Sequence, residues 1–246
     1  MVPVSVLILA KNEERNIGEC ILSCNFASEV IVIDDGSTDK TQEIAENLGA
    51  RVIHRSMNGD WGGQQTFAIQ QAKFPWIFFI DADERCTSEL CEEIAEKVNQ
   101  GDKYGYWVRR INHFKHKIVK HGPLSPDWVC RLMPTEGSYV EGFVHPKIVH
   151  QFQDKRLKCD MLHYTYETWE QYLNKMNHYS TLAAKKNIEQ GKTSNFVLDI
   201  ILRPAFAFFK MYILKLGILD GQIGYMLCKN YANYTMNKYV KMKFLK

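Results

Sequence analysis

The sequence predicts an α/β protein with a mostly parallel, doubly wound sheet and a helical extension at its C-terminal end. Three observations lead to this prediction. Apolar runs suited to buried strands alternate with segments of helical spacing through the first hundred residues, several of these runs end in acidic residues, and the pattern becomes helical from about residue 167. At 246 residues and 46% hydrophobic content, the chain is long enough for one large domain with an appendage.

The first two β–α units are indicated by residue spacing. Residues 4–10 ("VSVLILA") form a continuous apolar run, as expected of a strand buried on both faces. A segment of helical spacing follows, and residues 29–37 ("EVIVIDDGS") repeat the strand and end in acids and a glycine. We expect the next helix to be capped by Ser37 or Thr38 and to close on Gly49.

The third and fourth strands are expected at residues 50–55 ("ARVIHR") and 75–80 ("PWIFFI"). Between them, residues 60–74 predict a helix whose start is loosened by two glycines, and residues 87–98 predict a capped helix. Residues 104–165 are aromatic and β-branched with turn residues between, so we expect a mixed or antiparallel extension of the sheet there.

Acidic residues follow three of the predicted strands. Carboxylates buried without partners cost several kcal/mol each, so these groups must meet water, a cation or a ligand. Because the carboxyl ends of parallel strands lie at one edge of a sheet, the acids are expected to be neighbours that a nucleoside diphosphate and its metal would neutralise. Asp-Ala-Asp predicts an oxygen site for a hard cation such as Mg²⁺ or Mn²⁺. The acids are Glu13 and Glu14 after the first strand, Asp34 and Asp35 after the second, and Asp81, Asp83 and Glu84 after the fourth.

Alternative roles for these acids are less consistent with the sequence. Stabilisation by helix macrodipoles suits individual acids better than the whole set. A calcium loop counted from Asp81 would need an oxygen ligand at Arg85 and a glycine at Cys86. The turn after the first strand lacks the glycines of a dinucleotide site, the chain has no P-loop, and Arg85 breaks the Asp-x-Asp-x-Thr pattern of aspartyl phosphatases.

Cysteine usage and hydropathy indicate a cytosolic setting. The seven cysteines are scattered and include no Cys-x-x-Cys pair, which favours reduced thiols over a disulfide scaffold or a zinc site. The apolar N-terminal run has no basic flank, and no window of 18 uncharged apolar residues occurs, so we expect neither a signal peptide nor an ordinary membrane span.

The basic character of the chain belongs to its tail. Residues 203–246 carry eight Lys or Arg and one acid, while the rest of the chain is net acidic, and residues 203–219 are densely apolar. A pair of interfacial helices on an anionic membrane accounts for these features together, and places the protein peripherally on the inner face of the cytoplasmic membrane. The alternative is a helical hairpin that covers the sheet domain, and a nucleic-acid partner is disfavoured because the bases lie beside apolar residues.

Three motifs resemble the nucleotide-sugar-binding half of inverting glycosyltransferases of family 2, which have the GT-A fold: "VSVLILAKNEERNI", "VIVIDDGSTDKT" and "IFFIDADE". The further segments "RLM", "VHPK", "LHYTY" and "GILDGQIGY" resemble the bacterial subgroup that adds a sugar, often glucose, to the lipopolysaccharide inner core. The resemblance covers nearly the whole chain. It implies a GT-A catalytic domain at residues 1–165, a helical extension at 166–246, and metal-dependent, inverting transfer of a hexose from a UDP-sugar to a membrane-bound saccharide.

The resemblance also implies roles for individual residues. The metal acts as a Lewis acid on the departing diphosphate, while an acceptor hydroxyl, deprotonated by a carboxylate, attacks the anomeric carbon from the opposite face. By this resemblance Ala10, Asn12 and Glu13 line the uracil pocket, Asp35 with Asp34 binds base or ribose, Gln64, Asp81 and Ala82 contact the nucleotide sugar, and Asp83, Asp81 and His145 hold the metal.

The sequence departs from the family pattern at two places. Related sequences usually have Val-His-Glu where this chain has Pro146 at the third position, so the expected base is missing; Glu141, which we prefer, and Asp127 are the candidates. Gln65 and Thr66 replace a frequent Lys-Asn pair. These departures leave open a catalytically impaired nucleotide-sugar-binding partner of another transferase, and a peripheral membrane scaffold with structural acids is a further alternative.

Histidine and tryptophan residues have two interpretations each. His145 and His163 are either metal ligands or hydrogen-bonded structural residues. Trp61, Trp107 and Trp128 are more consistent with core packing than with stacking on sugar rings.

Overall fold

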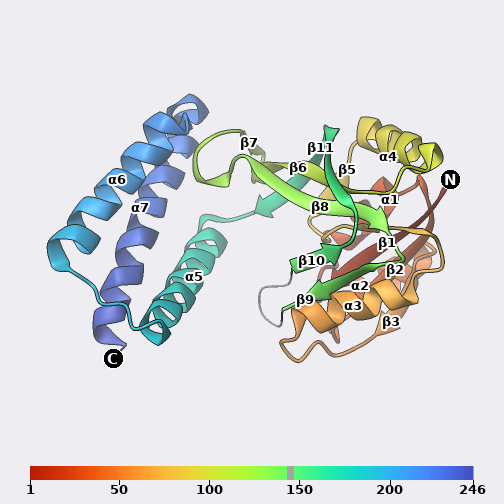
Figure 1. Cartoon of the computed structure of the whole chain (residues 1–246), viewed down its shortest axis with the longest axis horizontal. Coiled ribbons are helices and arrows are strands. Elements are labelled where there is room, and N and C mark those ends of the chain that lie inside the picture. Colours follow the sequence, from red (N-terminus) through yellow and green to blue (C-terminus); the bar gives the residue numbers. More distant parts are fainter. Residues whose placement is uncertain (143–146, 246) are drawn as a thin grey trace. The chain divides into compact units, whose positions relative to one another are not determined.

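The computed structural model describes residues 1–142 and 147–245. The chain forms two compact units (Figure 1). One comprises residues 1–110 and 128–163, and the other comprises residues 111–127 and the chain from 164 onward. His145 and Pro146, which the sequence analysis singled out, lie outside the described residues.

The first unit begins with a parallel sheet. Strand β1 pairs in parallel with β2 on one side and β4 on the other, and β2 pairs in parallel with β3. The predicted β–α alternation is therefore confirmed. The elements are β1 (Val2–Ala10), α1 (Ile17–Ser23), β2 (Ala27–Asp34), α2 (Thr41–Asn47), β3 (Arg51–His54), α3 (Trp61–Gln71) and β4 (Trp76–Phe79).

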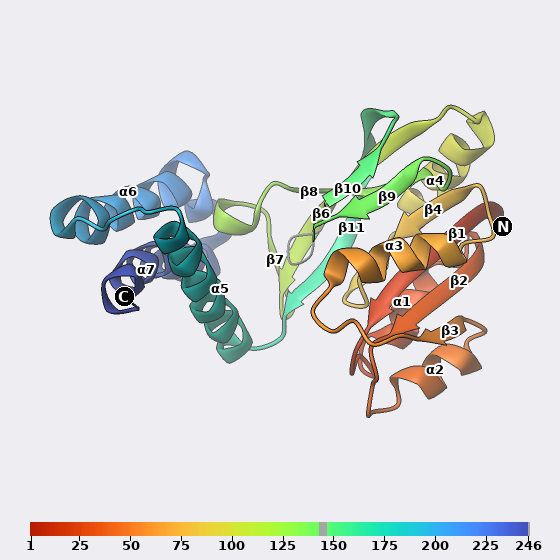
Figure 2. The same ribbon diagram turned by 60° about the horizontal axis from the view of Figure 1, so that its bottom comes forward.

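Both faces of this sheet are covered, which accounts for its continuous apolar strands. Neighbouring residues of a strand point to opposite faces, so Ile8 belongs to one hydrophobic core and Leu7 to the other. Helix α3 lies on one face of the sheet (Figure 2). Its residues Ala68 and Ile69 belong to the same core as Leu7. Helices α1, α2 and α4 (Ser88–Gln100) contribute to the other core.

The sheet continues with antiparallel pairs, as predicted for residues 104–165. Strand β8 is antiparallel to β4, and β11 is antiparallel to β5. The strand order is β3-β2-β1-β4-β8-β6-β11-β5, with β7 paired to β6, while β9 and β10 form a separate antiparallel pair. The remaining strands are β5 (Glu84–Cys86), β6 (Tyr104–Phe114), β7 (Lys117–Val119), β8 (Asp127–Pro134), β9 (Ser138–Glu141), β10 (Lys147–His150) and β11 (Gln153–Tyr166).

The second unit is mainly helical, as predicted. Its core contains Tyr166, Tyr172 and Leu227, and Thr168 caps α5 through a reciprocal capping box with Gln171. No helix in the described part of the chain combines the length and apolar character needed to cross a membrane. The elements are η1 (Gly122–Leu124), α5 (Trp169–Glu189), η2 (Phe196–Leu202), α6 (Arg203–Phe209), η3 (Lys210–Leu214), η4 (Gly217–Asp220) and α7 (Gly221–Phe244).

One local prediction is wrong. Ser37 and Thr38 do not cap α2, which begins at Thr41 without a side-chain cap. The helix predicted at residues 60–74 is present as α3, with Gly62 and Gly63 in its first turn. A Cβ on Gly62 would lie 2.1 Å from the carbonyl oxygen of Gly142, so the missing side chain allows close approach of the chain beyond β9.

Candidate active site

The end of β2 holds a buried carboxylate. Asp34 is 1% exposed, and its oxygens accept hydrogen bonds from the backbone N–H groups of Gly36 and Ser37 and from the Ser37 hydroxyl. His54 Nδ1 lies 3.2 Å from Oδ2 of Asp34. These bonds fix the turn after β2, where Gly36 adopts φ of +74°. Asp34 therefore has a structural role.

Asp35 lies beside the end of β1, because its backbone N–H donates to the carbonyl of Ala10. Its side chain accepts from the Met57 backbone N–H at 2.7 Å and pairs with the Lys11 ammonium at 3.0 Å. These two donors hold the pKa of Asp35 below its ordinary value. Asp35 is thus an ionised acceptor at the carboxyl edge of the sheet.

The loop after β1 is tied to the loop after β2. Asn12, at φ +57°, donates its backbone N–H to the Ser37 hydroxyl and accepts from the Thr38 backbone N–H. The Glu13 backbone N–H donates to the Thr41 hydroxyl. These bonds use Ser37 and Thr38, which is why neither caps α2.

The Glu13 carboxylate is close enough to that of Asp83, after β4, for their charges to interact. Burial raises the pKa of Glu13, the hydrogen bond from Asn16 opposes this rise, and the nearby Asp83 carboxylate adds to it. The acids after β1 and β4 are therefore electrostatic neighbours, as the parallel sheet predicts.

At the end of β4, Glu84 is fully buried between two arginines. Its Oε1 lies 3.0 Å from Arg110 Nη1 and 2.6 Å from Arg131 Nη2, and its Oε2 accepts the Asp81 backbone N–H at 2.8 Å. Burial raises the pKa of Glu84, and the Arg131 guanidinium opposes this rise. Glu84 holds the Asp81–Asp83 turn against strands β6 and β8.

Asp81 is more open, with a side chain that is 50% exposed. Arg131 Nη2 lies 2.6 Å from its Oδ2. Partial burial opposes ionisation, but the charges of Arg131, Arg110 and His163 outweigh it and hold the pKa of Asp81 below its ordinary value. Asp81 is therefore ionised and accessible.

Asp83 projects from the same turn, with a side chain that is 32% exposed. His163 Nε2, which comes from β11, lies 3.4 Å from its Oδ2. Two accessible carboxylates one residue apart fit a hard divalent cation such as Mg²⁺ or Mn²⁺. The donor set of this turn therefore suits the metal that the sequence predicts.

Side chains of Arg85 and Cys20 form hydrogen bonds with the backbone of the Asp81–Asp83 turn. Arg85, 7% exposed, donates through Nη1 to the carbonyls of Ala82 and Glu84, both at 2.7 Å. The Cys20 thiol donates to the Asp81 carbonyl at 3.5 Å. Arg85 thus fixes the turn that presents Asp81 and Asp83, which accounts for an arginine beside two acids.

Three other predicted residues have different surroundings. Gln64 is 1% exposed and is bonded at both ends of its amide to Arg55, which gives it a structural role. Glu141 is exposed at the end of β9 and accepts from the Tyr139 hydroxyl at 3.1 Å. Asp127 belongs to the second unit, where it accepts from the side-chain amide of Asn112 at 3.1 Å.

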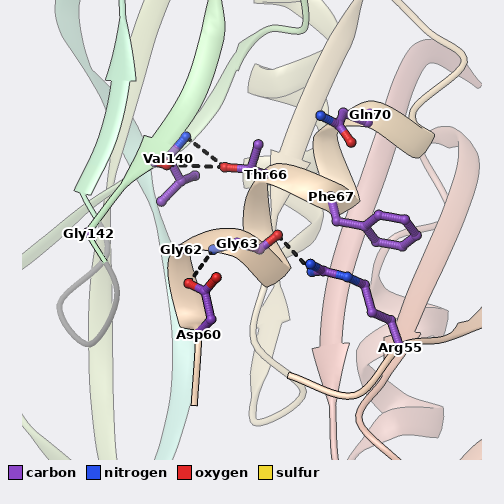
Figure 3. A pocket seen from close by; sticks show the side chains of 9 residues that line it. All are labelled: Arg55, Asp60, Gly62, Gly63, Thr66, Phe67, Gln70, Val140 and Gly142. Atoms are coloured by element: carbon purple, nitrogen blue, oxygen red, sulfur yellow. Dashed lines mark hydrogen bonds between the residues drawn. The ribbon is translucent and has the colours of Figure 1, made fainter. Parts of the chain in front are cut away.

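A cavity of about 470 Å³ lies between α3 and the end of β9 (Figure 3). The Thr66 hydroxyl bridges to the backbone of Val140, and Arg55 lies over the Phe67 ring with its guanidinium carbon 4.7 Å from the centroid. Thr66, one of the two departures from the family pattern, therefore joins α3 to β9.

The predicted tryptophans occupy different environments. Trp107 packs against the hydrophobic core on the Leu7 face, as expected. The Arg156 guanidinium lies over the Trp128 ring, with its carbon 4.7 Å from the ring centroid. Trp61 is 46% exposed at the start of α3.

Sequence reasoning did not identify the arginines that organise the site. Arg110 and Arg131 come from β6 and β8, more than 25 residues after Glu84. Their role could have been suspected from the sequence, because an arginine on the core-facing side of an apolar strand needs a buried partner of opposite charge. Arg110 follows the buried Val108 at a spacing of two residues.

Comparison with known proteins identifies relatives along almost the whole chain. The sequence model of "Glycosyl transferase family 2" matches residues 5–169. The lipopolysaccharide core biosynthesis glycosyltransferase LpsC of Rhizobium meliloti is 29% identical, over 99% of this chain and 94% of its own length. An uncharacterised glycosyltransferase of Rickettsia typhi is 34% identical, over 92% of this chain and 82% of its own length.

Two solved structures are also similar to this chain. Staphylococcus aureus TarS matches with a TM-score of 0.48 and 17% identity, over 99% of this chain and 92% of the other. Glucosyl-3-phosphoglycerate synthase of Mycobacterium tuberculosis, in complex with Mn²⁺ and UDP, matches with a TM-score of 0.39 and 26% identity, over 46% of this chain and 44% of the other. The family match and the strand topology together confirm the predicted fold class. The chain belongs to glycosyl transferase family 2 and is a glycosyltransferase.

Proposed function

We propose that this glycosyltransferase moves a hexose, glucose in the first instance, from a UDP-sugar to a membrane-bound saccharide such as the lipopolysaccharide core, with inversion at the anomeric carbon. The observation that carries the proposal is the pair of accessible carboxylates, Asp81 and Asp83, at the carboxyl edge of the sheet. This edge is the usual ligand site of open α/β sheets. The sequence similarity to LpsC supports the acceptor class.

The donor nucleotide is assigned to the loops after β1 and β2. Asp35 is ionised and fixed by Met57 and Lys11, so it can accept hydrogen bonds from ribose or uracil. The backbone at Ala10 and the Asn12–Glu13 pair form the adjacent wall. Asp34 and Gln64 support these loops from the interior and make no contact with the nucleotide in this proposal.

The divalent metal is assigned to Asp81 and Asp83. When bound, it supplies Lewis-acid stabilisation of the negative charge on the departing UDP. Arg131 and Arg110 keep Asp81 ionised and in place, and Glu84 keeps both arginines in place. The protein thus fixes the carboxylates before the ligands arrive, which limits the reorganisation needed during transfer.

The acceptor hydroxyl needs a base, for which we propose Glu141. Its carboxylate is exposed at the end of β9, and its sequence neighbours Val140 and Gly142 line the cavity beside α3. The hydrogen bond from Tyr139 positions one oxygen and leaves the other able to take a proton. Asp127 is the alternative base.

A transfer assay tests this function. Purified protein is incubated with UDP-glucose, Mn²⁺ and core lipopolysaccharide lacking its outer sugars, and release of UDP and mass gain of the acceptor are measured. Glu141→Gln is expected to lower turnover by about a hundredfold, and Asp127→Asn to leave it nearly unchanged. UDP binding by calorimetry without transfer to any saccharide would favour the impaired partner protein, and absence of UDP binding by folded protein would contradict the proposal.

We also propose that the second unit binds the membrane surface that carries the acceptor. Its segment 196–219 exposes large apolar side chains, beside the exposed Lys210 and Lys215. Exposed apolar patches rimmed by cations fit anionic lipid surfaces. A cavity of about 520 Å³, lined by Phe206, Tyr234 and Lys238 among others, adds space for part of a lipid. The exposed apolar residues are Phe196, Val197, Leu198, Ile201, Leu202, Phe206, Phe209, Ile213, Leu214, Leu216, Ile218 and Leu219.

Vesicle flotation tests this surface. The protein is expected to float with phosphatidylglycerol vesicles and to stay unbound with phosphatidylcholine vesicles, because lysine attraction requires anionic lipid. Phe206→Asp with Leu214→Asp should abolish flotation. Leu22→Asp in the first unit is the matched control, since Leu22, Phe206 and Leu214 are each 60% exposed. Equal flotation of both variants would contradict the proposal.

A further inference from the structure

Three potential metal ligands of different chemistry converge in the first unit, away from the Asp81–Asp83 turn in sequence. Cys130 comes from β8, His150 from the end of β10 and Asp154 from the start of β11. The Cys130 Sγ lies 3.7 Å from His150 Nε2, and the same nitrogen lies 3.3 Å from Asp154 Oδ1. All three ligand atoms lie within 4.8 Å of one another.

The histidine ring is oriented for coordination. Its Nδ1 lies 3.1 Å from the Phe152 carbonyl oxygen, to which it donates its proton. In the neutral ring the lone pair then belongs to Nε2, the nitrogen that faces both other ligands. Metal-binding histidines are commonly held in this way by a carbonyl on the far side of the ring.

The arrangement differs from a Cys–His–Asp nucleophile site. In such a site the acid holds one ring nitrogen and the other nitrogen faces the thiol. Here the thiol and the carboxylate lie at the same nitrogen, so the acid cannot orient the ring toward the thiol. Burial also raises the pKa of the Cys130 thiol to about 12, which keeps it neutral in the metal-free protein.

The separations match those of a tetrahedral zinc ion. Zinc–ligand bonds of about 2.3 Å to sulfur and about 2.0 to 2.1 Å to nitrogen and oxygen require a sulfur–nitrogen separation of about 3.6 Å and a nitrogen–oxygen separation of about 3.3 Å. The distances from His150 Nε2 to Cys130 Sγ and to Asp154 Oδ1 are 3.7 Å and 3.3 Å. Both separations from His150 Nε2 therefore already suit such an ion, and the third pair of ligand atoms lies within 4.8 Å.

The cluster opens into a cavity of about 470 Å³. All three ligands line it, together with Trp107 and Lys147. The indole Nε1–H of Trp107 is buried and has no hydrogen-bond partner in the part of the chain that the structure describes. Three protein ligands beside a cavity leave a fourth coordination position for water or a ligand.

We propose that Cys130, His150 and Asp154 form a second metal site, specific for Zn²⁺ and similar borderline transition metals. Its ligand set separates it from the carboxylates of Asp81 and Asp83, which suit Mg²⁺ or Mn²⁺. Coordination forms a metal–sulfur bond and releases the thiol proton to solvent. The bound ion joins β8 to the β10–β11 turn, one residue from Arg131.

Cobalt substitution tests the site directly. Co²⁺ added to the reduced, metal-free full chain is expected to give a thiolate-to-cobalt charge-transfer band in the near ultraviolet together with visible bands of a tetrahedral site. One equivalent of Zn²⁺ should remove both sets of bands. A tenfold excess of Mg²⁺ should not, because it does not bind thiolate.

Variants decide which residues bind. Cys130→Ser is expected to abolish the charge-transfer band, and His150→Ala and Asp154→Asn to weaken cobalt binding at least tenfold. Cys159→Ser is the matched control, because Cys159 is also a free cysteine of the first unit, and it should keep the band. Asp154 has a 59% exposed side chain, so Asp154→Asn tests the site even if Cys130→Ser fails to fold. No band, or a band of full intensity in Cys130→Ser, would overturn the proposal, and neither result bears on sugar transfer.

Discussion

The acids at the end of β2 and those at the end of β4 have different partners, although both pairs follow a buried parallel strand. Asp34 and Asp35 are 1% and 12% exposed at their side chains. Asp34 accepts mainly from Gly36 and Ser37 in its own turn, whereas Asp35 accepts from the Met57 backbone N–H and the Lys11 ammonium. Asp81 and Asp83 are 50% and 32% exposed.

The difference lies in how charge is balanced. At β2 the turn itself satisfies Asp34, whereas Asp35 is fixed by Met57 and Lys11 and can still accept from a ligand. At β4 the buried Glu84 shares Arg110 and Arg131 with Asp81, and the carboxylates of Asp81 and Asp83 stay accessible. We infer that the acids at the end of β2 position the loops of the site, and that the acids at the end of β4 bind the metal.

The largest expected effect is on the buried ion-pair network. Arg131→Met removes a cation from Glu84 and Asp81, so the free energy of unfolding should fall by about 3 to 5 kcal/mol. Urea denaturation followed by tryptophan fluorescence measures this. Arg109→Met is the control: Arg109 forms an ion pair with Asp160 but is 45% exposed, and a loss of about 1 kcal/mol or less is expected. Equal losses in the two variants would contradict the network's role.

The next effect separates chemistry from stability. Asp83→Asn should lower transferase turnover by about a hundredfold or more, which is the size seen when one charge-stabilising group is lost. The unfolding midpoint should change little, because the side chain is accessible. Asp102→Asn, at an exposed position, is the control and should have normal turnover. Near-normal turnover of Asp83→Asn at saturating Mn²⁺ would remove Asp83 from the proposed metal site.

The smallest effect tests the end of β2. Asp34→Ala leaves the N–H groups of Gly36 and Ser37 without their acceptor, and should cost about 1 to 3 kcal/mol of stability. Asp35→Ala should cost less, since one of its two donors is the exposed Lys11, but should weaken UDP binding more than Asp34→Ala does after correction for folded fraction. Thermal denaturation and calorimetry with UDP measure the two effects. The reverse order of UDP affinities would exchange the roles assigned to Asp34 and Asp35.

Much of the fold was predictable because it follows from local spacing. Continuous apolar runs indicated strands covered on both faces, and the structure places β1, β2 and β4 between two cores. The acidic strand ends were also predictable, since adjacent parallel strands end at one edge. Local bonding was less predictable: whether Ser37 caps α2 or binds Asp34 depends on backbone geometry that the sequence does not express.

The sequence by itself determined the sheet, the edge at which its acids gather and the family. Only the tertiary structure decided which acids remain accessible, because Arg110 and Arg131 reach Glu84 from strands that are distant in the chain. It also brought together Cys130, His150 and Asp154, whose spacing in the sequence does not indicate a metal site. The physical reason is the same in both cases: charge balance and coordination depend on distances in space, and antiparallel pairing of remote strands sets those distances.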